Sequence, residues 1–179
     1  MPVLILFSII TIFILRRIAR EIPLEGRNMY TRWLIAIAVL GLISIGLYTY
    51  DNIVNNDQVD MIGDPQYYYY DAEALLQSGV TSSFYPYYVR FITMFLFMGN
   101  AVTIRCAQLL LFLIVYAVSF MTLSRFGLKK EGYKYFSLCV GLNFAYYGIL
   151  SVTERDIFIL FHFAFLLCIF SYMLLLYDK

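Results

Sequence analysis

The chain has 179 residues, of which 62% are hydrophobic and 14% are charged, and its mean hydropathy is +0.76. Soluble domains are about 45–50% apolar and about 25% charged, so this composition argues against a soluble globular fold and against disorder. The formal net charge of +1 leaves no overall surface for polyanions, and nucleic acid is therefore not an expected partner. The apolar residues form stretches of membrane-spanning length. This predicts an all-α, polytopic helical membrane protein with about four to five spans in a single membrane domain, residues 1–179.

Five apolar stretches are candidates for these spans. The first is short for a span and is followed at once by Arg16 and Arg17, whereas a secretory signal carries its charges before the apolar region. We interpret it as an uncleaved anchor or first helix. Trp33 and Tyr50 flank the second stretch as an aromatic belt. In chain order the stretches are residues 1–15, 33–50, 101–123, 133–150 and 157–177.

Charge is distributed unevenly among the connections between these stretches. Residues 16–32 contain five Arg and two Glu, residues 125–134 contain four basic residues and one Glu, and residues 51–83 contain six acidic residues and no basic one. The positive-inside rule puts the two basic connections in the cytoplasm and the acidic loop outside. Only one span can then connect residue 84 to residue 124, so the short apolar segment 85–98 should be interfacial or re-entrant.

The outer acidic loop, residues 51–86, should contain a juxtamembrane helix over about residues 65–78. Asp64 is a preferred N-cap residue, and Pro65 suits the first helical position because its missing N–H would be unpaired there. Gly79 is a favourable stop for this helix. Its apolar face would consist of Tyr68, Ala72, Leu75 and Leu76.

Candidate chemistry lies in outward-facing carboxylates and in two arginines. Asp64 could act as a general base, and capping of the helix is its competing structural role. A second charged group consists of Glu154, Arg155 and Asp156. The alternative to a catalytic role for this group is that its side chains snorkel to the interface at a span boundary. Arg90 and Arg105 lie in apolar segments, where a guanidinium is costly unless it faces a cavity or binds an anion such as a phosphate. No cofactor is predicted, although the acidic residues could bind a divalent cation.

The order of these motifs resembles the first outer loop of the GT-C glycosyltransferases. These membrane enzymes use polyprenyl- or dolichyl-phosphate sugars, and the most similar are the protein O-mannosyltransferases and the lipid A aminoarabinose transferase. The pattern has an Asp that leads into a short helix, a Tyr four residues later, an aromatic-Pro segment, an Arg near the start of a span, and a second acidic residue that opens a later helix. Over residues 30–179 the matching positions are Asp64, Tyr68, Ala74, Leu75, Leu76, Gly79, Tyr85, Pro86, Gly99, Arg105 and Asp156.

The resemblance implies a membrane glycosyltransferase, or its N-terminal module, in the bacterial inner membrane with its active face outward. It would transfer a sugar from a lipid-phosphate donor to an acceptor on that face, with Asp64 and Asp156 as catalytic carboxylates. The substrate-binding residues would be Tyr68, Arg90, Arg105, Glu154 and Arg155. Its partners would be the sugar donor and membrane lipids. Because family members are commonly two to three times longer, a second membrane subunit could complete the fold.

Two other interpretations stay open. The first is a non-enzymatic membrane subunit or scaffold that keeps this architecture without the chemistry. The second is a small transporter or channel component, which rests only on the intramembrane positions of Arg105 and His162.

Overall fold

The computed structural model describes residues 2–54, 64–80, 86–97, 100–127, 130–143 and 156–177. Every regular element in these ranges is an α-helix, which confirms the predicted all-α class. The helices are α1 (Pro2–Glu21), α2 (Leu24–Val54), α3 (Asp64–Ser78), α4 (Pro86–Leu96), α5 (Ala101–Arg125), α6 (Lys130–Gly141) and α8 (Asp156–Tyr177).

Three helices are long and apolar enough to cross a membrane, which indicates a membrane protein. They are Pro2–Glu21, Leu24–Tyr50 and Val102–Arg125. Among the described residues, α8 contributes a shorter apolar stretch, Ile159–Leu174, and α6 has only 12 residues. The described part of the chain thus supplies three spans by length and composition, and the predicted number of four to five is not confirmed.

The first two helices are longer than the sequence predicted. α1 continues past residue 15 through the arginines to Glu21, because arginine is a good helix former and these side chains remain exposed. Pro23 ends this run, since the residue before a proline is disfavoured in the α conformation. α2 then begins at Leu24 rather than at Trp33, so the connection between the two helices is short.

The span predicted over residues 133–150 is not one continuous helix. α6 ends at Gly141, and Leu142 and Asn143 follow it outside the helix. Glycine and asparagine are common at helix C-termini because they tolerate non-helical backbone conformations. Residues 144–150 lie outside the described residues.

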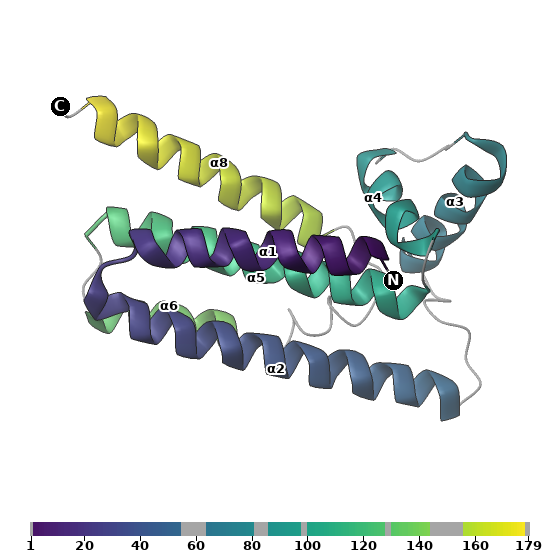
Figure 1. The fold of residues 1–179 in the computed structure, drawn as a ribbon, viewed down its shortest axis with the longest axis horizontal. Coiled ribbons are helices and arrows are strands. Elements are labelled where there is room, and N and C mark those ends of the chain that lie inside the picture. The colour runs from purple at the N-terminus through teal and green to yellow at the C-terminus, as the bar shows by residue number, and fades with distance from the viewer. Residues whose placement is uncertain are drawn as a thin grey trace.

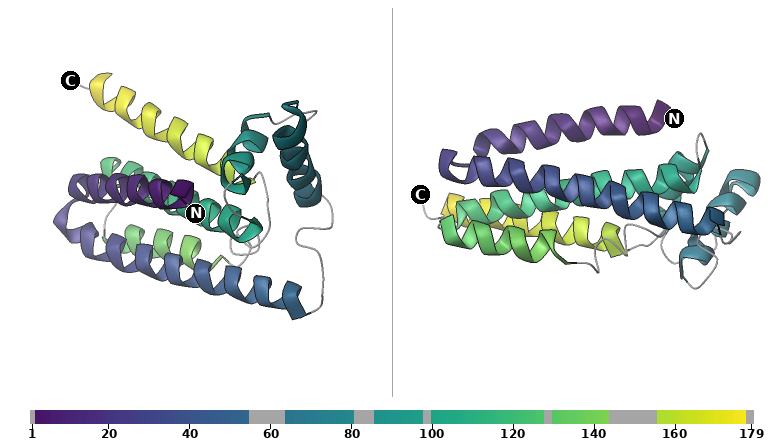
Figure 2. Two further views of the ribbon diagram at one scale, coloured as in Figure 1. Left: turned by 45° about the vertical axis from the view of Figure 1, so that its right-hand side comes forward. Right: turned by 90° about the horizontal axis from the view of Figure 1, so that it is seen from below.

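α5 is the central helix of the bundle (Figure 1). It packs against α1, α2 and α8, while α6 packs mainly against α2. Figure 2 shows α1, α2, α5, α6 and α8 extended alongside one another, with α3 and α4 gathered at one end. The apolar residues of α5 are therefore mostly buried, whereas α1 and α2 expose most of theirs. Exposed apolar helix faces of this kind suit a lipid environment.

The two ends of the bundle differ in charge. The last turns of α1 and α5 lie beside the first turns of α2 and α6 (Figure 1). We call this part of the bundle the basic end. Its basic side chains include Arg16, Arg17, Arg20, Arg27, Arg125 and Lys134. α3 and α4, which we call the hairpin, lie at the opposite end, together with the start of α5 and the start of α8. The bundle thus separates the basic connections from the acidic loop.

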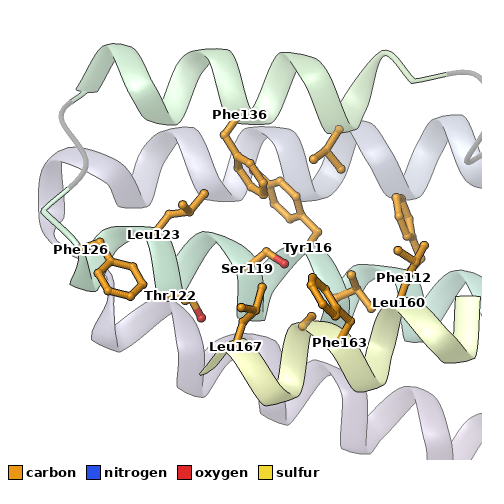
Figure 3. Close-up of a pocket in the computed structure, with 13 residues that line it drawn as sticks. Phe112, Tyr116, Ser119, Thr122, Leu123, Phe126, Phe136, Leu160, Phe163 and Leu167 are labelled. Atoms are coloured by element: carbon orange, nitrogen blue, oxygen red, sulfur yellow. The ribbon is translucent and has the colours of Figure 1, made fainter. Parts of the chain in front are cut away.

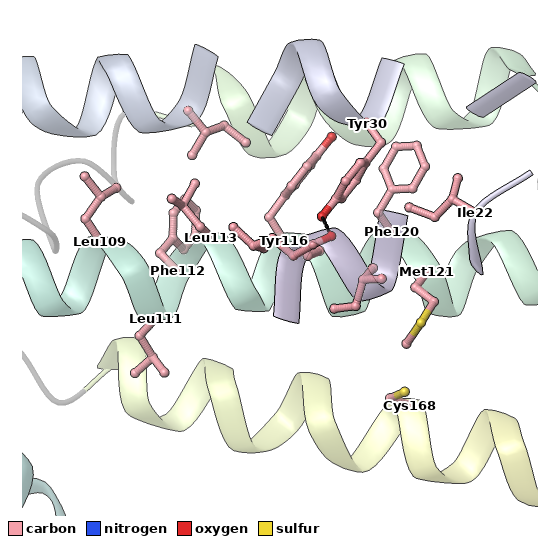
Figure 4. Packing of buried hydrophobic residues seen from close by; sticks show 14 of the residues in the cluster. Ile22, Tyr30, Leu109, Leu111, Phe112, Leu113, Tyr116, Phe120, Met121 and Cys168 are labelled. Atoms are coloured by element: carbon pink, nitrogen blue, oxygen red, sulfur yellow. Dashed lines mark hydrogen bonds between the residues drawn. The ribbon is translucent and has the colours of Figure 1, made fainter. Parts of the chain in front are cut away.

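The main core is aromatic where α2, α5 and α6 meet (Figure 4). Tyr30 stacks on Tyr116 with 6.0 Å between ring centroids, and Phe120 stacks on Tyr133 at 4.8 Å. The Tyr30 hydroxyl donates a hydrogen bond of 3.2 Å to the backbone carbonyl of Leu15, which also ties α2 to α1. These ring contacts set the distances between α2, α5 and α6, and few polar atoms take part in them.

Gly141 allows α6 to approach α2 closely, and we expect substitution there to weaken this contact. A Cβ atom at Gly141 would collide with the indole ring of Trp33, which is too rigid to move aside as a flexible aliphatic chain can. Gly141→Val should therefore lower the free energy of unfolding by about 1–3 kcal/mol, measured by titration with SDS. Gly46→Val is the matched control, because nothing lies within 4 Å of a Cβ atom at that position of α2. Equal loss in both variants would contradict the close contact.

Candidate functional site

The hairpin is formed by two short helices whose ends are set by local sequence. Gly79 has a φ of +73°, a conformation that L side chains rarely adopt, and its N–H donates to the carbonyl of Leu75 at 2.9 Å. This contact ends α3. α4 begins at Pro86, where the absence of a proline N–H leaves no backbone donor unpaired.

One face of α3 packs onto α4, which in turn packs onto α5. Tyr68 and Ala72 are buried, as predicted, whereas Leu76 is 40% exposed. Asp71 takes part in the buried face instead, with only 7% of its surface exposed. The reason is helical geometry: Asp71 lies one turn from Tyr68 and next to Ala72, while Leu76 is rotated away from the centre of the face.

Tyr88 links the hairpin to the bundle. Its ring meets the Tyr68 ring edge to face, with 5.1 Å between centroids. Its hydroxyl accepts a hydrogen bond of 3.2 Å from the side-chain amide of Gln108, which is fully buried in α5. Val89, Ile92 and Phe95 complete the buried face of α4. A continuous series of contacts therefore runs from α3 through α4 to α5.

The start of α5 is fixed by a capping box. The Asn100 side chain accepts from the Thr103 backbone N–H at 3.1 Å, and the Thr103 hydroxyl accepts from the Asn100 backbone N–H at 3.2 Å. These reciprocal bonds satisfy two donors at the helix start. Arg105 and Gln108 follow in this helix one turn apart, and both side chains are buried.

Arg105 is the largest fully buried side chain among the described residues. One guanidinium nitrogen donates to the Thr49 hydroxyl at 3.2 Å, and the guanidinium carbon lies 4.6 Å from the centre of the Tyr48 ring. Both partners belong to the last turns of α2. A buried charge is costly, so an arginine retained in an apolar helix at this position points to a binding or structural task that a neutral residue cannot perform.

Together these residues form what we call the hairpin-end cluster. Its members are Tyr48, Thr49, Tyr68, Asp71, Tyr88, Arg105 and Gln108. It combines a cation, a carboxylate, an amide and several phenol rings at the end of the bundle opposite the basic end. Groups of this kind can hold an anionic headgroup and orient a hydroxyl-bearing substrate.

The structure brings some of the predicted site residues together and separates others. Tyr68 and Arg105 are both buried at the hairpin end and are linked through Tyr88, which contacts Tyr68 and binds Gln108, one turn after Arg105. Arg90 lies on the exposed face of α4, away from the buried side chains of that helix. Asp64 and Asp156 are the first residues of α3 and α8, and both helices begin at the hairpin end (Figures 1 and 2). The side chains of these two aspartates, and residues 151–155 with Glu154 and Arg155, lie outside the described part of the structure.

Five members of the cluster are absent from the predicted site: Tyr48, Thr49, Asp71, Tyr88 and Gln108. The sequence contains a signal for two of them. Asp71 falls within the apolar face of α3, and Gln108 follows Arg105 by one turn within an otherwise apolar helix. Polar residues on a buried face are informative because burial without a partner is costly. Tyr88 carries no such signal, since it is one of many tyrosines in this region.

No group of three or more His, Cys, Asp or Glu side chains that could hold a metal ion occurs among the described residues. His162, considered as an intramembrane titratable group, lies on the exposed face of α8 and contacts the Phe161 ring edge to face at 5.8 Å. Its position separates it from Arg105, which is buried between α5 and α2.

Comparisons with protein-family models, with curated proteins and with solved structures find no match to this chain. The fold and the hairpin-end cluster therefore carry the functional argument alone. They define the class as a helical membrane protein with a buried polar cluster at one end of its bundle.

Proposed function

We propose that the protein is a membrane glycosyltransferase of the GT-C type, or its N-terminal module. It transfers a sugar from a polyprenyl-phosphate donor to an acceptor that arrives at the hairpin end. The observation that carries this proposal is the fully buried Arg105 of α5, one turn before Gln108, whose side chain binds Tyr88 of the tyrosine-rich hairpin, at the bundle end where α3 and α8 begin. An arginine in this position suits a lipid phosphate, because its planar guanidinium can donate two hydrogen bonds to one phosphate group.

The proposed chemistry divides the work among the cluster and the two helix-opening aspartates. Asp64 or Asp156 accepts the proton of the acceptor hydroxyl as that oxygen attacks the anomeric carbon. The bond between this carbon and the phosphate oxygen breaks, and Arg105 stabilises the negative charge on the departing lipid phosphate. Tyr68 and Tyr88 form the wall of the site. Their rings supply contact surface and their hydroxyls supply hydrogen bonds.

In this proposal the hairpin end faces outward across the bacterial inner membrane and the basic end faces the cytoplasm. The three spans become four or five if one or both of α8 and the stretch that begins with α6 also cross. The charge difference between the two ends supports this orientation.

Thiol labelling tests the orientation. In a chain whose native cysteines are replaced by serine, a cysteine at Tyr67 of α3 should react with an impermeant maleimide added to intact cells. A cysteine at Lys134 of α6 should react only after the membrane is opened. Both native side chains are exposed in the structure, so burial does not explain a difference. The reverse pattern would remove the active site from the outer face.

The function is tested by donor binding and by transfer in the purified protein. Native mass spectrometry from nanodiscs with added undecaprenyl phosphate should show that the wild-type protein retains one molecule of this lipid. Arg105→Met should lose the lipid, and Arg105→Lys should retain it only in part. Arg32→Met, at an exposed position of α2, is the matched control and should retain it. A lipid equally well retained by Arg105→Met would overturn the role of this guanidinium.

Transfer itself should depend on Asp64. Asp64→Asn should abolish consumption of donor from a mixture of polyprenyl-phosphate sugars in proteoliposomes while leaving the elution volume and the melting temperature unchanged. Glu73→Gln removes another carboxylate from α3 and should remain active. Loss of folding together with activity in Asp64→Asn would instead indicate that the carboxylate acts only as a helix cap.

The alternative function is a non-enzymatic membrane subunit. One observation favours it: Arg105 already contacts Thr49 and Tyr48, and such contacts also serve to hold α2 against α5. A double variant, Asp64→Asn with Asp156→Asn, distinguishes the two functions. Full complementation of the deletion strain by this variant would support the subunit and exclude the enzyme.

A further inference from the structure

α1 presents an exposed apolar face that lies outside the hairpin-end cluster. Ile5, Ile9 and Phe13 expose 59%, 59% and 73% of their surface. Leu15 and Ile18, on the other side of the helix, are buried against the bundle. The right-hand view of Figure 2 shows α1 at the edge of the bundle. Because α1 is long and apolar enough to cross a membrane, this exposed face meets lipid.

The same face continues into two arginines at the basic end. At about 100° of rotation per residue, Ile9, Phe13, Arg16 and Arg20 project within about 60° of one another. Both arginine side chains are exposed. Residues one turn apart on a helix have Cβ atoms about 5–6 Å apart, so the two guanidinium groups can reach one phosphate group from the same side. The apolar part of the face and its charged part thus lie on one line along the helix.

Few acidic groups in this part of the chain compete for the two arginines. Residues 16–32 contain five Arg and two Glu. Glu21 forms an ion pair of 2.7 Å with Arg125 of α5 and also lies 3.9 Å from Arg17. The other acid, Glu25, belongs to the first turn of α2. The excess of positive charge is therefore available to an anion outside the protein.

The apolar groove along α5 between α6 and α8 lacks this combination (Figure 3). Its lining among the described residues includes Phe112, Ser119, Phe136 and Leu167, and no charged side chain belongs to it. No group there would distinguish one class of lipid from another. The face of α1 differs because its apolar surface ends in cations at the end of a spanning helix, where long basic side chains reach the headgroup layer.

We propose that the exposed face of α1 binds an anionic phospholipid whose phosphate contacts Arg16 and Arg20 and whose acyl chain lies along Phe13 and Ile9. Basic side chains beside a membrane helix favour anionic headgroups, and a planar guanidinium can donate two hydrogen bonds to one phosphate. The apolar residues select a lipid over a soluble phosphate. The site lies at the basic end, whereas Arg105 lies near the start of α5 at the hairpin end, so it does not depend on the glycosyltransferase function proposed above.

Lipid binding to the delipidated full chain in detergent tests the proposal. Titrations with dioleoyl-phosphatidylglycerol and with dioleoyl-phosphatidylcholine, followed by native mass spectrometry, should give at least tenfold tighter binding of the anionic lipid. Each basic residue near a membrane surface contributes a factor of about five, so Arg16→Gln combined with Arg20→Gln should weaken binding of phosphatidylglycerol about 25-fold. Equal affinity of the wild-type chain for the two lipids would overturn the proposal.

Two matched variants separate a phosphate contact from a general effect of charge. Lys134→Gln removes an exposed positive charge from α6 at the same end and should leave the affinity for phosphatidylglycerol within about twofold of wild type. Arg16→Lys combined with Arg20→Lys keeps both charges but loses the paired donors of the guanidinium, so binding should weaken by a smaller factor than in the glutamine variant. An equal loss in Lys134→Gln and in Arg16→Gln alone would mean that the total charge attracts the lipid, and would overturn the site.

Photo-crosslinking of the wild-type chain locates the lipid without any substitution. Phosphatidylglycerol with a diazirine in its acyl chain, added at one lipid per protein, should form adducts mainly on residues 5–16 of α1. Adducts mainly on α5 and α8, which line the apolar groove, would overturn the proposal. So would a stable dimer in lipid-free detergent that Phe13→Arg dissociates, because a second copy of the chain would then cover this face.

Discussion

Phe120→Ala is expected to lower the free energy of unfolding by about 2–4 kcal/mol. Phe120 is fully buried, and its ring contacts those of Tyr30, Tyr116, Tyr133 and Phe136. Phe→Ala changes in protein cores cost about 3–5 kcal/mol, and part of that comes from transfer out of water. When membrane helices separate, the Phe120 ring moves into lipid rather than water, so the transfer cost is small. The lost packing and the cavity account for the remaining cost.

The cavity would lie where three helices meet, so its effect should reach beyond α5. SDS titration followed by the fluorescence of Trp33 on α2 reports both the loss of stability and the loosened contact between α2 and α6. Phe13→Ala is the control, because Phe13 is 73% exposed on α1 and its removal should change stability by less than about 0.5 kcal/mol. Similar losses in the two variants would mean that this aromatic group does not hold the bundle together.

Arg125→Ala is expected to release α8 from the bundle at a cost of about 2–4 kcal/mol. The Arg125 guanidinium forms an ion pair of 2.7 Å with Glu21 of α1 and lies 3.6 Å from the ring centre of Tyr172 in α8. The Tyr172 hydroxyl donates to the same Glu21 carboxylate at 3.4 Å. A charge-assisted hydrogen bond contributes about 1.5–3 kcal/mol and a cation–π contact about 0.5–2 kcal/mol, and the substitution removes both.

Cys168 reports this change directly. Its thiol is 8% exposed in α8 and lies 3.7 Å from an Arg125 nitrogen. With Cys106 and Cys139 replaced by serine, its reaction with a maleimide should be at least tenfold faster in Arg125→Ala, because each 1.4 kcal/mol of lost stability is a factor of ten.

Arg17→Ala provides a matched control on the same carboxylate. Arg17 is 67% exposed and lies 3.9 Å from Glu21, so its ion pair is screened and should contribute less than about 0.5 kcal/mol. If Arg17→Ala increased labelling of Cys168 as much as Arg125→Ala, the ion pair across the bundle would not be what holds α8.

The elements that depend on local signals were predictable. The short helix that begins at Asp64 ends at Ser78, directly before Gly79, as expected, because a glycine readily adopts the positive φ that stops a helix. The apolar stretch after residue 101 forms α5, because its length and composition allow little else. The predictions were less accurate where a run of arginines continued a helix, as in α1, and where a glycine and an asparagine ended one, as in α6.

The residues of the candidate site were likewise predictable only where a local signal marks them. The sequence alone marks Arg105 as unusual, because a charge within an apolar helix is costly wherever that helix lies. It also predicts that Tyr68 and Ala72 share a face, since a helical period fixes their relative direction. It does not predict that Thr49 contacts Arg105, or that Gln108 binds Tyr88, because these pairs are separated by 56 and 20 residues in the chain.

The sequence by itself determined that this is an all-helical membrane protein whose basic connections and acidic loop are separated by apolar helices, because hydropathy and charge act residue by residue. Only the tertiary structure decided that Asp71 is buried while Arg90 is exposed, and that α5 is the helix around which the others pack. Those outcomes depend on which face of each helix meets a neighbour. That choice is made by packing among α1, α2, α4, α5 and α8 together, and no single segment contains it.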